Sequence, residues 1–293
     1  MSFIHKIICS LFLSAIATSQ LMACDIQVTH PLQENSKDEL VVELLKLSLS
    51  KVNKSVCFDE LSETLTEARK VHYVIEKRLS LKWGSAGGHY VEHLQEVAQP
   101  IFRGLGGYRI LVIRQGEEAR FKNVNSLEDL TSFTVGQGAF WGDTRVLENA
   151  GLKVEKSTQA RKLWKMLHAK RFDYIALAVH EPWKELAVRP DLQMAVEPNI
   201  LLVYPSALYF YVHKNNQALY ELLDSGMKKA LADGSYYQKL VNSQMIKDTI
   251  KYANIAKRKV IELDNPFIKQ NDMATTELLK YLVSANDSAK VTR

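Results

Sequence analysis

The sequence predicts an α/β fold made of two strand–helix units in series, followed by a helical C-terminal stretch. Short apolar runs bounded by glycine, proline and polar residues alternate with segments of helical period between residues 25 and 213, which is typical of α/β architecture. The composition is that of an ordinary globular protein, with 46% hydrophobic and 24% charged residues. A chain of 293 residues is also long enough to bury two separate cores.

The first unit reads strand, helix, strand, helix, strand. Alternation of side chains predicts a strand over residues 25–30, and leucines at helical spacing predict a helix over 38–49 that Asp38 caps. The remaining elements are a strand over 55–61, a helix over 65–79 and a strand over 80–83. The last strand runs into a glycine-rich segment at residues 84–88, where a ligand can approach the backbone.

The second unit begins after a glycine-rich turn at residues 100–107. Its predicted elements are a strand over 108–114, a helix started by Ser126, a strand over 133–136, a helix over 143–150, a strand over 152–155, a helix over 158–169, a strand over 173–178 and a helix over 181–187. Two further strands are predicted over 200–204 and 209–213, and residues 217–284 are predicted to be mostly helical.

The apolar strands near residues 110 and 210 bracket the second unit, and we expect them to be crossovers between two lobes. The first lobe would then be discontinuous, comprising residues 24–109 and 212–293, and the second lobe would comprise 110–211. Ligands of such sheets bind in the crevice at the carboxyl ends of strands. The glycine-rich loops follow predicted strands, so we expect them at that crevice.

Residues 1–23 have the pattern of a secretory signal peptide. Lys6 lies before an apolar run at residues 7–17, and small residues ending at Ala23 follow it. The alternative is a transmembrane anchor, but the apolar run is short for crossing a bilayer. The pattern therefore predicts export to the periplasm.

The chain has three cysteines, of which Cys9 lies within the predicted signal peptide. The other two, Cys24 and Cys57, are what one disulfide requires in an oxidising compartment. The segment ending in Cys24, Leu-Met-Ala-Cys, also resembles a bacterial lipobox, so a lipoprotein anchored at Cys24 is a second, less favoured interpretation. Two free thiols are the third.

Several functional classes lack their usual signals in the sequence. The net charge of +5 is spread along the chain without a basic stripe, so we expect no nucleic-acid partner. No metal-binding spacing or catalytic triad is recognisable, and we expect no metal and no cofactor. A nicotinamide site is disfavoured because Gly136 and Gly138 are followed by bulky Phe140 and Trp141 rather than a third glycine in register.

Five stretches resemble the extracellular solute-binding proteins of family 3, the amino-acid-type binding proteins of ABC transporters, in a subgroup without a defined ligand. They are PIFRGLGGYRILVIRQGEE, VNSLEDLTSFTVGQGAFWGDTRVLENAGLKV, KLWKMLHAKRFDYIA, EPNILLVYPSALYFYVHKNN and GMKKALADGSY. The resemblance implies a type II periplasmic-binding-protein fold, two α/β lobes joined by a two-strand hinge that closes on a small solute. It implies a monomer that delivers this solute to an ABC permease rather than an enzyme.

Two alternatives stay open beside a transport function. The same fold serves some exported dehydratases, which would need a placed acid, and periplasmic sensor modules. The chain ends after the predicted clamp, and we therefore favour a free solute-binding protein.

The sequence departs from the family at two positions that hold an amino-acid ligand. Family members usually carry an arginine for the ligand carboxylate in the segment before the proline that precedes the hinge strand. Here that segment reads SAGGHYVEHLQEVAQP, without arginine. They also tend to place an aspartate after the strand over 173–178, where Ala178 and Val179 stand, with Glu181 slightly later. The ligand therefore stays undefined.

The predicted ligand-binding residues lie at strand ends and at the hinge. Trp83 can form an aromatic wall and Ser85 can donate a hydrogen bond. The loop after the strand over 133–136 offers Gln137, Gly138, Trp141 and Thr144 at a helix N-terminus, with Asp143 as an alternative cap.

Three charged residues complete the predicted set. Arg103 and Arg109 flank the glycine-rich turn, and Arg109 either reaches an acidic ligand or pairs with an acid to fix the hinge. Glu181 either holds a ligand amine or starts the next helix.

Overall fold

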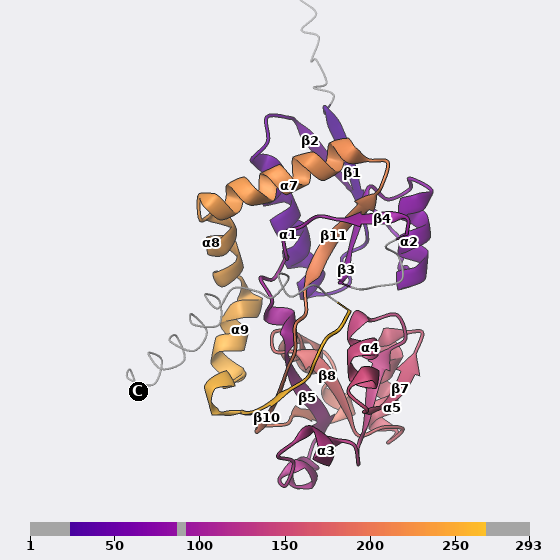
Figure 1. Cartoon of the computed structure of the whole chain (residues 1–293), viewed down its shortest axis with the longest axis vertical. Helices are drawn as coiled ribbons and strands as arrows, with labels where there is room; N and C mark the ends of the chain where they lie inside the picture. Colours follow the sequence, from indigo (N-terminus) through magenta and orange to yellow (C-terminus); the bar gives the residue numbers. More distant parts are fainter. Residues whose placement is uncertain (1–23, 87–91, 268–293) are drawn as a thin grey trace, which may run out of the picture.

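The computed structural model describes residues 24–86 and 92–267 and divides them into two lobes stacked along the long axis of the molecule (Figure 1). The predicted signal peptide, residues 1–23, lies outside the described residues. Among the residues that the structure describes, no helix combines the length and apolar character needed to cross a bilayer. The same residues contain no cluster of three or more His, Cys, Asp and Glu side chains suited to a metal ion.

The first lobe is built on two small sheets covered by helices. Its strands are β1 (Ile26–His30), β2 (Val56–Glu60), β3 (Leu81–Ser85), β4 (Leu94–Glu96) and β11 (Leu208–His213). β1 pairs with β2 in parallel, whereas β11 lies antiparallel between β3 and β4. Its helices are α1 (Ser36–Ser50), α2 (Glu67–Ile75), α7 (Gln217–Ala232) and α8 (Ser235–Val241).

The second lobe contains one sheet of seven strands among the described residues. Its strands are β5 (Tyr108–Arg114), β6 (Thr134–Gly138), β7 (Lys153–Ser157), β8 (Tyr174–Ala178), β9 (Met194–Val196), β10 (Ile200–Val203) and β12 (Lys259–Glu262). The order is β12-β10-β5-β8-β6-β7, with β9 also beside β5. Its helices are α3 (Leu127–Leu130), α4 (Gly142–Asn149), α5 (Leu163–His168) and α6 (Pro182–Ala187).

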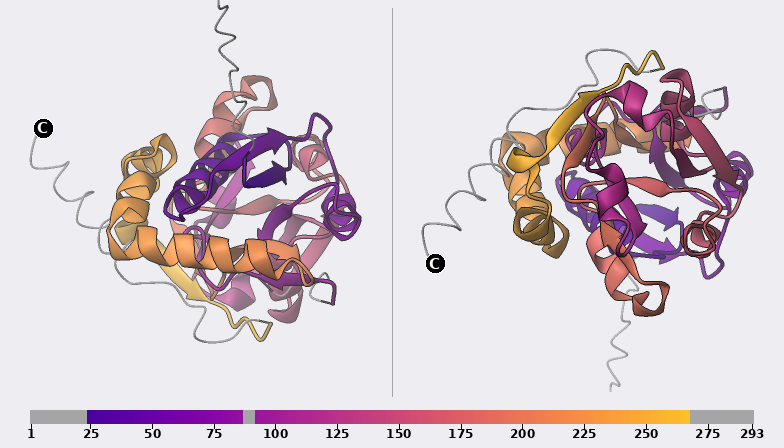
Figure 2. Two further views of the ribbon diagram at one scale, coloured as in Figure 1. Left: turned by 90° about the horizontal axis from the view of Figure 1, so that it is seen from above. Right: turned by 90° about the horizontal axis from the view of Figure 1, so that it is seen from below.

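Both lobes bury apolar side chains, but the main cluster of the first lobe continues into the second lobe through Ile110, Val179 and Leu201. In the first lobe, α1 packs against α7, which lies across the top of the molecule in Figure 1 and faces the viewer in the left view of Figure 2. In the second lobe, successive residues of β5 enter different cores: Leu111 and Ile113 pack with α4, and Val112 packs with α5. This alternation follows from the period of two along a strand, and it lets helices cover both faces of the sheet.

The two lobes are joined where β5 begins and β10 ends. The backbone N–H of Tyr204 donates to the carbonyl of Gly107 over 3.0 Å, and Val203 pairs with Tyr108. Gly107 has to be glycine at this crossing, because a Cβ there would collide with the carbonyl oxygen of Tyr204. The chain therefore crosses between the lobes before β5 and after β10, whereas the strand near residue 210, which the sequence predicts as the second crossover, belongs to the first lobe as β11.

The end of the described chain differs from the sequence prediction. The sequence predicts mostly helix over residues 217–284, and the two bracketing strands place residues 212–293 in the first lobe. Instead α9 (Gln244–Tyr252) contacts both α8 and α6, and β12 pairs in parallel with β10 at the edge of the second-lobe sheet (Figures 1 and 2). The sheet edge offers unpaired backbone groups that β12 satisfies, so the chain returns to the second lobe.

Two helix caps also differ from prediction. α1 is capped by Asn35, whose side chain accepts from the backbone N–H of Asp38 over 3.0 Å. α4 begins after Trp141 without a side-chain cap. The aspartates expected as caps, Asp38 and Asp143, are instead buried and bind other side chains at the boundary between the lobes. Ser126, by contrast, forms the predicted capping box with Asp129.

The structure joins Cys24 and Cys57 in a disulfide that links the start of β1 to β2, with Cα atoms 5.7 Å apart. The bond encloses a sequence separation of 33 residues. It occupies the thiol of Cys24 that a lipid anchor would require.

Candidate functional site

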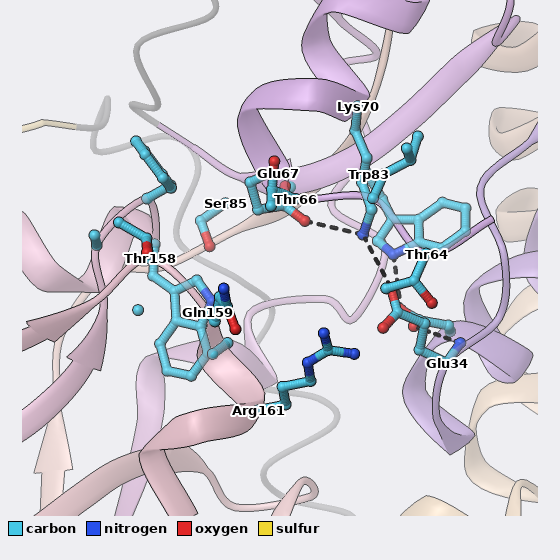
Figure 3. Close-up of a pocket in the computed structure, with 18 of the residues that line it drawn as sticks. Glu34, Thr64, Thr66, Glu67, Lys70, Trp83, Ser85, Thr158, Gln159 and Arg161 are labelled. Atoms are coloured by element: carbon cyan, nitrogen blue, oxygen red, sulfur yellow. Dashed lines mark hydrogen bonds and ion pairs between the residues drawn. The ribbon is translucent and has the colours of Figure 1, made fainter. Parts of the chain in front are cut away.

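Three adjoining cavities lie between the lobes and together form a cleft. We call them the outer cavity, of about 350 Å³, the side cavity, of about 210 Å³, and the inner cavity, of about 80 Å³. Residues of both lobes line each of them, and Lys37 and Trp141 line all three. A separate open hollow between α1 and α8 is lined by the first lobe alone. Figure 3 shows the outer cavity.

The first-lobe wall of the cleft is organised around Trp83, the middle residue of β3. Its indole Nε1 donates to Asp38 Oδ1 over 2.9 Å, and the backbone N–H of Glu34 donates to Asp38 Oδ2 over 3.2 Å. Trp83 and Asp38 are both buried. These residues meet because the loop after β1 and the end of β3 lie at the same edge of the lobe, where a cleft is expected.

A second group of charges on the first-lobe wall comes from α2 and β3. Glu67 accepts from Lys70 and from Lys82, each over 3.0 Å, and Lys70 also lies 4.0 Å from Glu34. Burial works against the charge of Glu67, but the two lysines prevail and lower its pKa to about 2. Glu34 has the weaker ion pair, and its burial raises the pKa of its carboxyl group. Figure 3 shows Glu34, Glu67 and Lys70 side by side.

At the base of the cleft, Arg109 lies between two acids of the second lobe. Its Nη2 donates to Asp143 Oδ1 over 2.5 Å, and its Nη1 lies 3.7 Å from Glu181 Oε2. The hydroxyl of Tyr204 donates to the same oxygen of Asp143 over 3.0 Å. The side chains of Arg109 and Asp143 are only 7% and 8% exposed, so this ion pair is shielded from water.

Lys37 connects the two lobes. Its Nζ lies 2.9 Å from Glu181 Oε1, although Lys37 belongs to α1 and Glu181 follows β8. The backbone N–H of Ala178 donates to the other carboxylate oxygen of Glu181 over 2.8 Å. Burial disfavours the charge of Glu181, but Lys37 and Arg109 overcome it and hold its pKa well below the usual range.

The second-lobe wall is formed by the loop after β6 and by residues 157–161. Trp141 lies against Gly138, where a Cβ would come within 2.6 Å of the indole. Ser157, Thr158, Gln159 and Arg161 extend this wall. In Figure 3, Arg161 points into the space between the lobes.

His180 is a polar group buried between the side and inner cavities. It is 4% exposed, its ring lies 5.0 Å from that of Phe102, and neither ring nitrogen has a hydrogen-bond partner among the described residues. Burial lowers its pKa to about 4, because the charged form loses its hydration. The imidazole is therefore neutral at pH 7 and offers one donor and one acceptor.

Most of the sequence-predicted site residues reach the cleft. The six that line at least one cavity are Trp83, Ser85, Arg109, Gly138, Trp141 and Glu181. Of the two interpretations of Arg109, the structure shows the pairing with acids at the hinge. Glu181 precedes α6 and is already held by Lys37 and Arg109.

Three predicted residues do not line the cleft. Gln137 is buried, and its Nε2 donates to the carbonyl of Ala176 over 3.1 Å. Thr144 is buried as well, and its hydroxyl donates to the carbonyl of Gly138 over 2.7 Å. Arg103 lies in the turn before the hinge with a φ of 48°, outside the three cavities.

Sequence reasoning missed the charged residues that line the outer cavity, namely Glu34, Lys37, Asp38, Glu67, Lys70 and Arg161. The first three follow the carboxyl end of β1, which is where the topology rule places ligand contacts. That rule provides a signal for them. Lys70 and Arg161 lie on or before helices with ordinary charged patterns, and no local signal distinguishes them.

No protein-family model matches the chain, and no curated protein sequence matches it. Solved structures do match its fold. An ancestral arginine-binding protein bound to arginine superposes with a TM-score of 0.53 at 15% identity, covering 73% of this chain and 96% of that one. An amino acid ABC transporter substrate-binding protein from Streptococcus pneumoniae bound to L-arginine gives 0.52 at 12% identity, covering 77% and 94%.

A third match comes from signalling rather than transport. A histidine kinase sensor domain with similarity to periplasmic binding proteins superposes with a TM-score of 0.54 at 12% identity, covering 73% of this chain and 94% of that one. At these identities the likeness shows the fold alone. The chain has the fold of the amino-acid-type periplasmic binding proteins, as the sequence predicts.

Proposed function

We propose that this chain is an exported solute-binding protein that captures a small polar solute between its two lobes for ABC-type uptake. The observation that carries the proposal is the cleft itself: adjoining cavities lined from both lobes at a hinge. Ligand sites of this kind are concave, with apolar walls and a few placed polar groups. The fold shared with substrate-binding proteins supports the same function.

Within this proposal, Trp83 and Trp141 are the aromatic walls against which the solute packs. Trp83 belongs to the first lobe and Trp141 to the second, and both line the outer cavity. Ser85 and the backbone of Gly138 supply hydrogen bonds from opposite sides. A solute that contacts both lobes stabilises the closed arrangement by its differential affinity for it.

The further setting follows from the proposed role. We propose that residues 1–23 direct export to the periplasm, that the mature chain acts as a monomer, and that its partner is a permease in the inner membrane. The sensor-domain neighbour supports a second candidate, a periplasmic sensor module. Solute uptake in cells lacking the protein distinguishes them, because only a transport receptor is needed for uptake itself.

We infer that the cleft is not an active site for elimination chemistry. Such chemistry needs an acid free to exchange a proton with the substrate. The acid nominated from the sequence, Glu181, is bound by Lys37 and lies near Arg109, and these cations keep its pKa low. Turnover of a bound compound by the purified protein would contradict this inference.

A thermal-shift screen tests the proposed function. The mature protein is heated with amino acids, amines, organic acids and oligosaccharide fragments at millimolar concentration. A solute that binds only the folded state raises the unfolding temperature through RT ln(1 + [L]/Kd). Stabilisation by one chemical class is the expected result, and no stabilisation by any compound would count against a solute-binding function.

A further inference from the structure

The charged side chains that line the cleft do not all have a partner of opposite charge within the chain. This difference bears on which solute binds, and the inference drawn from it rests on the proposed function. Each carboxylate that lines the three cavities lies near a donor or cation of the chain itself. The pairs are Glu34 with Lys70, Asp38 with Trp83, Glu67 with Lys70, Asp143 with Arg109, Glu181 with Lys37, and Glu185 with Arg189. A solute ammonium therefore meets acids that are already engaged.

The cations of the cleft divide differently. Lys37, Arg109 and Arg189 each take part in one of these pairs, and Lys70 takes part in two. Arg161 lines both the outer and the side cavity, and no acid lies within ion-pair distance of it among the described residues. The acid that faces it is Glu34, which lies near Lys70 and whose pKa burial raises. Among the described residues that line the cleft, Arg161 is therefore the cation without an acid partner.

Its chemistry defines what it can take. A guanidinium presents parallel N–H donors that match the two oxygens of a carboxylate, and such bidentate pairs are strong and directional. Arg161 belongs to the 3₁₀ turn Ala160–Lys162 before α5, and its side chain points into the outer cavity (Figure 3). The anionic group of a solute would thus be held from the second lobe.

Lys37 has a complementary effect at the base of the cleft. Its ammonium lies 2.9 Å from Glu181, the acid that follows β8 and that sequence analysis offered as the partner of a ligand amine. The protein's own ammonium already occupies that carboxylate. An amine on the solute gains little there, because it would have to displace Lys37 first.

We propose that the cleft selects a small organic anion of the carboxylate class, held by Arg161, while Lys37 fills the acid that would otherwise receive an ammonium group. Arg161 is then a ligand-binding residue, and Lys37 is a specificity-determining residue. The solute is recognised by its negative charge and its fit between Trp83 and Trp141, and an amino group adds little to its affinity.

Three probes that share one phenyl side chain test this inference by calorimetric titration: 3-phenyllactate, phenylalanine and 2-phenylethylamine. We expect the two carboxylates to bind with dissociation constants within about threefold of each other, and the amine to bind at least about tenfold more weakly. Preferential binding of the amine, tenfold tighter binding of phenylalanine than of phenyllactate, or no binding of phenyllactate would overturn the inference. The proposed function fails separately, only if the whole solute panel fails.

Two variants with matched controls locate the effect. Arg161→Gln is expected to weaken phenyllactate binding at least about tenfold, whereas Lys162→Gln, an equal charge change at the exposed neighbouring residue, leaves it unchanged. Lys37→Met removes the closest cation from Glu181, leaving Arg109 at 3.7 Å, and is expected to raise the affinity for phenylalanine over phenyllactate at least about fivefold. Lys184→Met is its control, because Lys184 pairs with Glu39 across the lobes at an exposed site. Unchanged binding in Arg161→Gln, or unchanged preference in Lys37→Met, contradicts the assigned role.

Discussion

The buried ion pair at the hinge yields a quantitative prediction for Arg109→Met. Arg109 and Asp143 are 7% and 8% exposed, and their side chains are 2.5 Å apart. Removing one partner of a buried pair leaves the other charge without compensation and costs about 3–5 kcal/mol. Of the partners that the structure describes, Asp143 then keeps the hydroxyl of Tyr204 and Glu181 keeps Lys37. We therefore expect a loss of about 3 kcal/mol, toward the lower end of this range.

Urea denaturation measures this loss as a shift of the transition midpoint at constant slope. Arg120→Met is the matched control, because Arg120 also bridges two acids, Glu117 and Asp173, but is 45% exposed. Its expected cost is at most about 1 kcal/mol. Adding Asp143→Asn to Arg109→Met should restore much of the stability, since it removes the orphaned charge and keeps an acceptor for Tyr204. A loss below about 1 kcal/mol for Arg109→Met, or no recovery in the double variant, would refute the reasoning.

Three further predictions concern the disulfide, a buried histidine and the contact between the lobes. Replacing Cys24 and Cys57 by serine should lower the free energy of unfolding by about 3–4 kcal/mol, because the loop between them becomes unconstrained in the unfolded chain. A urea transition like that of the oxidised wild type would disprove this prediction. Burial lowers the pKa of His180 to about 4 in the folded state, so protonation favours the unfolded chain. The free energy of unfolding should therefore fall by up to about 3 kcal/mol as the pH drops from about 6.5 to 4. His180→Leu should flatten that part of the pH–stability profile, and an unchanged profile would speak against a buried neutral imidazole. At Gly142 of the second lobe, an added Cβ would come within 2.8 Å of the Cβ of Ser85 in the first lobe. Gly142→Ala should therefore hinder closure and raise the dissociation constant of the solute. A titration that shows equal affinity would argue against closure at this contact.

The α/β class and most elements follow from local patterns in the sequence. The strands β1, β5, β8 and β11 form where side-chain alternation or apolar runs predict them. β12 was not predictable in this way, because its place depends on the free edge that β10 offers. The spacing of apolar residues along the sequence carries no information about a pairing strand that lies far away in the chain.

The residues of the candidate site also fall into those that local sequence patterns predict and those that depend on tertiary contacts. Trp83 precedes Gly84 near the end of β3 and Trp141 follows β6 beside Gly142, positions where aromatic residues next to glycine indicate a ligand wall, and both line the cleft. The position of Asp143 in the sequence suggests a helix cap. In the structure the carboxylate of Asp143 instead pairs with Arg109, because a buried guanidinium needs a counter-charge. Which charges pair, and which one is left for a solute, depends on both lobes at once. The availability of Arg161 therefore emerges only from the folded chain.

The central claim is that one small solute binds in the cleft between the lobes. Calorimetric titration of the best stabilising compound into the wild type and into Trp141→Ala tests it most directly, because Trp141 lines all three cavities. The account predicts one solute per chain for the wild type and at least about tenfold weaker binding for the variant. Equal affinity of the two proteins, or several solutes bound per chain, would contradict it.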